Sequence, residues 1–109
     1  MQEERMKLLL DFLAQEPDVP FNRYAVAMEL IKSDRQRAVE HLEVLIEEHP
    51  TYLPTYYQLA QLYFDVDALD EADKVYLKGI DLAVAQKNQK IEAELRGAYR
   101  MLLDDMEEY

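Results

Sequence analysis

The sequence repeats itself at intervals of 33 and 34 residues, and this repetition restricts the fold more than any other feature. The first matched set lies 33 residues apart and pairs Tyr24, Val26, Ala27 and Leu30 with Tyr57, Leu59, Ala60 and Tyr63. The second lies 34 apart and pairs Ala38, Leu42, Leu45 and Pro50 with Ala72, Tyr76, Gly79 and Val84. The change of interval indicates that the turn around Ser33 and Asp34 is one residue shorter than the turn around Asp67 and Ala68. A period near 34 built from two helices is typical of a helical repeat, whose units bury their apolar faces only by stacking.

The apolar spacing predicts six helices, over residues 2–15, 20–32, 35–48, 52–66, 69–86 and 89–107. Short polar side chains able to cap free amide groups precede four of them, at Asp18, Asp34, Thr51 and Asp67. Pro17 and Pro50 are expected to close the helices before them.

The first and last helices differ from the paired ones. Arg5, Leu9, Phe12 and Pro17 stand 33 residues before Ala38, Leu42, Leu45 and Pro50, so the first helix matches a second helix whose partner is missing. The last helix carries one apolar stripe of Ile91, Leu95, Ala98 or Tyr99, Leu102 and Met106, with charged residues opposite. We interpret it as a capping helix with a polar outer face, which an open stack needs to stay soluble.

The block Tyr56, Leu59, Ala60, Tyr63, Ala72, Tyr76 and Gly79 resembles the tetratricopeptide repeat, with looser matches in the earlier unit. Ala60 stands where the family has glycine, Gly79 where it usually has alanine, and Val84 where it has proline. Relative to alanine, Gly79 is expected to cost about 0.5–1 kcal/mol of helix propensity.

The resemblance implies an all-α fold: a right-handed superhelical stack of helix-turn-helix repeats with about six antiparallel helices. The expected organisation is one domain over 1–109, as in small bacterial tetratricopeptide proteins. It consists of a half-repeat helix (1–17), a first repeat (18–50), a second repeat (51–86) and a capping helix (87–109).

No motif in the sequence predicts an enzyme, a cofactor or a metal site. Cysteine is absent, and His41 and His49 are about 12 Å apart along one helix, too far to share a metal ion. Asp65 to Asp73 lacks the glycine and the glutamate of a calcium loop and instead suggests acids at a helix start. His49 is expected at the carbonyl end of its helix, and the final DDMEEY is expected to be a solvated tail.

The net charge of −11 opposes binding to nucleic acid or anionic lipid surfaces. The N-terminal segment has only three consecutive leucines and acidic residues at its front, unlike a secretory signal, and no segment approaches the roughly 20 apolar residues of a membrane span. A cytoplasmic location is therefore expected.

The resemblance also implies that the first helix of each pair lines a concave groove. The positions carried over to the groove are Phe21, Tyr24, Met28 and Ile31 in one unit, and Tyr57, Gln61 and Phe64 in the next. Aromatic residues and methionine are common at adaptable interfaces, although an aromatic stripe at helical spacing also fits a buried core. The basic clamp by which some members grip a carboxylate is absent, since Tyr24, Met28 and Gln58 take those places. Arg96 and Arg100 form a basic pair on the last helix that could contact an anion near the end of the groove.

Two functions are consistent with these features. The first is a scaffold that binds a peptide segment of a partner protein in this groove. The second is a homodimerising module that pairs through the groove or the last helix without a separate ligand.

Overall fold

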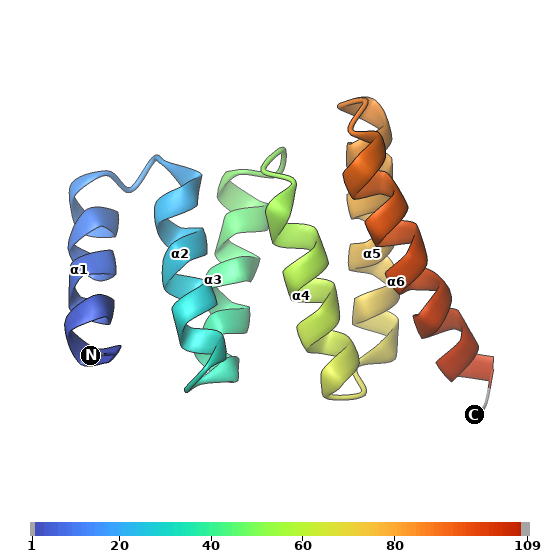
Figure 1. The fold of residues 1–109 in the computed structure, drawn as a ribbon, viewed down its shortest axis with the longest axis horizontal. Coiled ribbons are helices and arrows are strands. Elements are labelled where there is room, and N and C mark those ends of the chain that lie inside the picture. Colours follow the sequence, from blue (N-terminus) through green and yellow to red (C-terminus); the bar gives the residue numbers. More distant parts are fainter. Residues whose placement is uncertain (1, 108–109) are drawn as a thin grey trace. The chain divides into compact units, whose positions relative to one another are not determined.

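The computed structural model describes residues 2–107, whose regular structure consists of six α-helices (Figure 1). They are α1 (Gln2–Gln15), α2 (Pro20–Ile31), α3 (Arg35–Glu48), α4 (Pro54–Asp65), α5 (Leu69–Ala85) and α6 (Gln89–Glu107). The all-α prediction is confirmed, and every predicted boundary is correct to within two residues. Glu108 and Tyr109 of the predicted tail lie outside the described residues.

The chain divides into two compact units between Tyr52 and Leu53, with α1–α3 in the first unit and α4–α6 in the second. The predicted single domain over 1–109, with its repeat boundaries, stays a prediction. Within residues 2–107, no helix has both the length and the apolar character needed to cross a bilayer.

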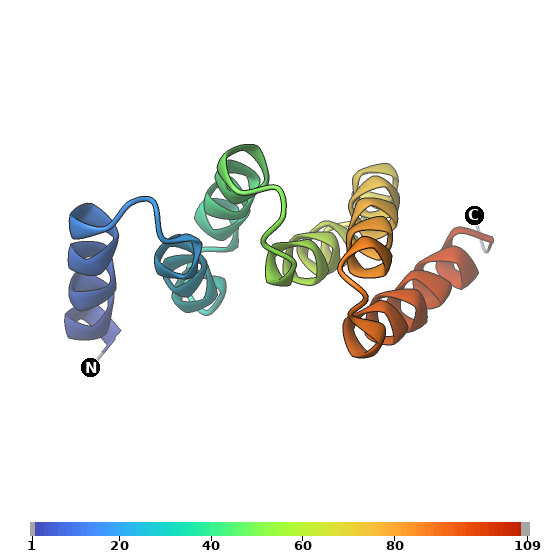
Figure 2. The same cartoon turned by 90° about the horizontal axis from the view of Figure 1, so that it is seen from above.

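In the first unit, α2 packs against both α1 and α3, as Figure 2 shows from above. Its core comes from two helices and consists of Val26, Ala27 and Leu30 of α2 with Ala38, Leu42 and Leu45 of α3. By contrast, α1 has no buried residue. The first helix is therefore attached along one side only, where Met6, Leu9 and Leu13 are half-buried.

In the second unit, α5 packs against both α4 and α6. Tyr56, Leu59 and Ala60 of α4 are buried with Ala72, Tyr76 and Ile80 of α5. The predicted stripe of α6 faces α5, because Leu95 and Leu102 are fully buried and the Tyr99 hydroxyl donates to Asp73 Oδ1 at 2.7 Å.

Three residues separate the helices at both inner turns, but counted from the equivalent residues Leu30 and Tyr63 the second turn is one residue longer, as the change of interval indicated. The amide of Asp34 donates to the carbonyl of Leu30, four residues back, whereas the amide of Ala68 donates to Tyr63, five residues back. The additional residue is Asp67, whose φ of 60° is left-handed. With the bond from the Asp67 amide to Phe64, this forms a Schellman motif that satisfies the last carbonyls of α4.

Helix capping was predicted correctly at one position and wrongly at three. Asp34 is the N-cap of α3, and its Oδ1 accepts from the Arg37 amide at 3.2 Å. The N-caps of α2, α4 and α5 are Val19, Leu53 and Ala68, without side-chain bonds, in place of Asp18, Thr51 and Asp67. A proline occupies the first turn of both α2 and α4, where its fixed φ and missing N–H suit a helix start. Asp67 lies instead at the end of α4, with its left-handed φ.

The expectation that Gly79 only lowers helix propensity relative to alanine was incomplete. A Cβ placed there would lie 2.8 Å from the Tyr56 Cβ and 3.3 Å from Leu95 Cδ1. Gly79 therefore lets α5 approach α4 and α6 at the same point.

Candidate functional site

Four predicted groove residues form a stripe on α2, and none of them is buried. Phe21 is 59% exposed, and Tyr24, Met28 and Ile31 are half-buried. Their spacing of three or four residues places them along one face of α2, beside its core positions. This set is called the α2 stripe below. Its members reach the surface of the first unit.

Tyr24 is held in place by a second aromatic ring. The Tyr24 and Tyr52 rings meet edge to face, with centroids 5.7 Å apart, a favourable arrangement for aromatic pairs. Burial, followed by the neighbouring Tyr24, raises the pKa of Tyr52. Tyr24 thus offers a ring whose orientation is supported from the side.

The remaining three predicted groove residues, Tyr57, Gln61 and Phe64, form the corresponding α4 stripe. Tyr57 is 36% exposed, while Gln61 and Phe64 are half-buried. Gln61 Oε1 accepts a hydrogen bond of 2.9 Å from the Tyr76 hydroxyl. Gln61 therefore stabilises the second unit in addition to facing outward.

The two stripes lie in different units, the α2 stripe in the first and the α4 stripe in the second. The alternative that these side chains are wholly buried does not hold for any of the seven. Whether they bind a ligand stays a prediction.

The predicted basic pair on α6 is exposed, but one member already has a partner. Arg96 Nε contacts Glu92 Oε2 at 2.8 Å, one turn away on the same helix. Arg100 is exposed. The pair therefore offers an anion less positive charge than two unpaired arginines would.

The histidines lie in two different settings. His49 is the C-cap of α3, at the carbonyl end of that helix as predicted. His41 accepts from Arg23 Nη1 at 2.9 Å through Nδ1, and burial, then Arg23 and Arg37, lower its pKa below the ordinary value. Within the described part of the chain, no three metal-ligating side chains gather into a possible site.

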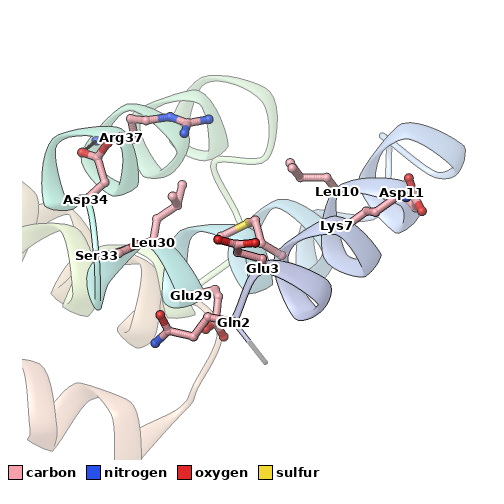
Figure 3. Close-up of a pocket in the computed structure, with 11 residues that line it drawn as sticks. Gln2, Glu3, Lys7, Leu10, Asp11, Glu29, Leu30, Ser33, Asp34 and Arg37 are labelled. Atoms are coloured by element: carbon pink, nitrogen blue, oxygen red, sulfur yellow. Dashed lines mark hydrogen bonds between the residues drawn. The ribbon is translucent and has the colours of Figure 1, made fainter.

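A cleft in the first unit was not predicted from the sequence (Figure 3). It has a volume of about 640 Å³ and lies between α1 and the α2–α3 turn. Its walls carry Met6, Leu10 and Leu30, with charged groups of both signs that include Lys7, Arg37, Glu3, Asp11, Glu29 and Asp34. This mixture of charges does not select one class of ligand.

Glu29 is a buried carboxylate that the sequence reasoning also missed. It is only 7% exposed, and its Oε1 contacts Arg5 Nε at 3.3 Å and Lys32 Nζ at 3.5 Å. Its equivalent 33 residues later is the buried Leu62. The sequence signal for Glu29 was its position as a charged residue on the same helix face as the apolar Val26 and Leu30. A charge buried on such a face needs partners.

Comparison with known proteins places the chain among solved helical-repeat structures. No protein-family model and no curated protein sequence matches it. A solution structure of a tetratricopeptide repeat domain protein from Salinibacter ruber shares 40% identity over 79% of this chain and 88% of its own, with a TM-score of 0.75. A crystal structure of such a domain from the same organism shares 40% identity over 76% and 94%, with a TM-score of 0.72. A Bordetella parapertussis protein at 21% identity, covering 92% and 88% with a TM-score of 0.78, shows similarity of fold alone.

Proposed function

Because the chain belongs to the tetratricopeptide repeat family, we propose that it is a protein-binding scaffold. A peptide segment of a partner protein contacts the α2 stripe and the α4 stripe through apolar side chains. The proposal assigns no catalysis to the chain.

The observation that carries this proposal is the exposure of one large ring on each stripe. Phe21 is 59% exposed and Tyr57 is 36% exposed. Aromatic residues supply much of the binding energy at protein interfaces because each buries a large rigid area on association. Half-buried Met28 adds an adaptable apolar contact to the α2 stripe.

The character of the stripes also favours one type of ligand. Tyr24, Met28 and Gln58 occupy the places at which some family members hold a carboxylate, and none of them is basic. An apolar segment of the partner, rather than a free carboxylate end, is therefore the proposed ligand.

Affinity purification with stripe variants tests the proposal. Tyr57→Ala and Phe21→Ala each remove one exposed ring, and each is expected to lower recovery of the same partner while helicity by circular dichroism stays unchanged. Leu77→Ala is the matched control, because Leu77 is 43% exposed on α5 and lies outside both stripes. Undiminished recovery with both ring variants would refute the proposal.

The homodimer alternative gives a different outcome in light scattering. A dimer with a dissociation constant near 1 μM would be almost complete at about 100 μM chain. A strict monomer at that concentration removes this alternative, whereas a dimer that both ring variants dissolve replaces the partner peptide with a second copy.

A further inference from the structure

The helix α1 is less buried than α3, although both pack against α2. No residue of α1 is buried, and Met6, Leu9 and Leu13 are only half-buried. In α3, by contrast, Leu42 and Leu45 are fully buried. Because burial of apolar side chains supplies most of the stability of a helix in a protein, α1 is held less firmly than α3.

A charged side chain lies at the contact between α1 and α2. Glu29 of α2 is 7% exposed, and its Oε1 contacts Arg5 Nε of α1 at 3.3 Å. The equivalent position in the second unit is Leu62, which is 5% exposed. The cost of removing charges from water offsets much of the attraction within such a pair. The contact at Glu29 therefore holds α1 less firmly than a well-packed apolar residue would.

Two clefts flank the first half of α1. The cleft of Figure 3, of about 640 Å³, is lined by Met6 and Leu10 on one side of this helix. A second cleft, of about 570 Å³, is lined by Arg5 and Leu8 on the other side. Glu29 of α2 lines both clefts. Space therefore remains on both sides of the contact between α1 and Glu29.

Undocking of α1 would leave no buried charge without a partner. Lys32 Nζ contacts the same Glu29 oxygen at 3.5 Å, and Lys32 lies on α2 itself, so this contact does not require α1. Glu29 also regains water on the side that α1 covers. The Arg5 side chain is already 67% exposed. The electrostatic cost of separating the two helices is therefore small.

We propose that α1 is a flap that undocks from α2 as one unit, with the contact between Arg5 and Glu29 as its latch. Undocking joins the two clefts and exposes more of Leu30, which lines the first of them. A single helix of 14 residues is marginal in water, so the undocked α1 loses its hydrogen bonds. The helices α2 and α3 share a buried core and stay folded. The latch includes no residue of either stripe.

Amide hydrogen exchange of the full chain, followed by NMR, measures the opening. Amides in the interior of α1 are expected to share one protection factor, which is lower than that of the α3 amides around Leu42 and Leu45 by about tenfold or more. Leu45→Val weakens only the core between α2 and α3. It should speed exchange in α3 about tenfold and leave exchange in α1 unchanged, because the closed and open states of the flap both contain that core.

Variants of the latch test its residues. Arg5→Gln is expected to raise exchange in α1 about tenfold. Arg96→Gln is the matched control, because Arg96 also contacts a carboxylate and is 56% exposed, but within α6. Glu29→Gln keeps the shape of the side chain without its charge. The double variant of Arg5 and Glu29 should raise exchange in α1 by less than the product of the two single increases.

Three results would overturn the proposal. Equal protection of α1 and α3, or an equal response of both to Leu45→Val, would show that α1 does not open separately. Protection that changes steadily along α1 would indicate fraying from one end instead of undocking. An α1 exchange rate that Arg5→Gln leaves unchanged would remove the latch. None of these results bears on the stripes, because Tyr57→Ala and Phe21→Ala test that function separately.

Discussion

The buried hydroxyl of Tyr76 donates its hydrogen bond to Gln61, so a residue predicted to line the groove also satisfies a polar group of the core. The bond is 2.9 Å long, and Tyr76 has no exposed surface. Burial, followed by Tyr57 and Asp65, raises the pKa of Tyr76 to about 12. The hydroxyl therefore remains a donor throughout the neutral pH range.

Replacing Gln61 with leucine is expected to lower the free energy of unfolding by about 1–3 kcal/mol, because the buried Tyr76 hydroxyl loses its acceptor. Urea unfolding followed by circular dichroism measures the change. Tyr76→Phe removes the donor as well, so the double variant should lose less than the sum of the two single losses. Additive losses would mean that the bond contributes nothing to stability.

The two glycines of the chain are expected to respond to alanine in opposite directions. A Cβ at Gly79 would lie 2.8 Å from the Tyr56 Cβ, whereas a Cβ at Gly97 would meet nothing within 4 Å. Gly79→Ala should therefore destabilise the chain by about 1–3 kcal/mol through overpacking. Gly97→Ala should stabilise it by about 0.5–1 kcal/mol through helix propensity. Thermal or urea unfolding of both variants, compared with the parent, checks the signs.

The helices were predictable from the sequence because the repeat contains the same spacing of apolar residues twice. Val26 and Leu30 match Leu59 and Tyr63 at the same helical phase, and the two members of each pair indicate the same buried face. The sequence signals for the helix ends were weaker. Asp67 reads locally as a cap, but it takes the left-handed position that ends α4, and only the hydrogen bonds of the folded turn distinguish these two roles.

The exposure of the candidate site could not be predicted from the sequence. Helical periodicity identifies the residues that share one face of a helix, but it does not identify the neighbouring helix that covers this face. Phe12 and Leu45 occupy equivalent positions, yet Phe12 is 48% exposed and Leu45 is buried. The difference lies in the neighbouring helix and not in either residue. Gly79 shows the same limit, since its contact with Tyr56 depends on how closely α5 approaches α4.

Lys87 provides a position at which glycine should increase stability. Its φ is 59°, and its amide and that of Asn88 close the end of α5 through bonds to Val84 and Ala83. A left-handed conformation costs a lysine about 1–2 kcal/mol that glycine avoids. Lys87→Gly is thus expected to raise the free energy of unfolding by about 0.5–1 kcal/mol.

Lys78→Gly is the control for this substitution, because Lys78 is exposed within α5. There, glycine should lower the free energy of unfolding by about 1 kcal/mol. Equal effects of glycine at both positions, measured by urea unfolding, would contradict the assignment of Lys87 to the helix end.

His41 is expected to make the stability of the chain depend on pH near neutrality. Its pKa in the folded chain lies below the ordinary 6.5, chiefly because of burial and then because of Arg23 and Arg37, with Glu40 acting in the opposite direction. The unfolded chain therefore binds the proton more readily. The free energy of unfolding should be highest above pH 6.5 and should fall as the pH drops through 6.5 toward the lower pKa of the folded chain.

Besides burial, the contact between Arg23 Nη1 and His41 Nδ1, at 2.9 Å, contributes to this pH dependence. Because an arginine only donates, the imidazole must be neutral to accept this bond, and protonation would place two cations together between α2 and α3. His41→Gln keeps an acceptor without a titrating group, so its unfolding midpoint in urea should vary less between pH 8 and 5 than that of the parent. His49→Gln is the matched control, because it removes the other histidine and keeps the contact between Arg23 and His41. If His41→Gln retained the slope of the parent, another group would have to be its source.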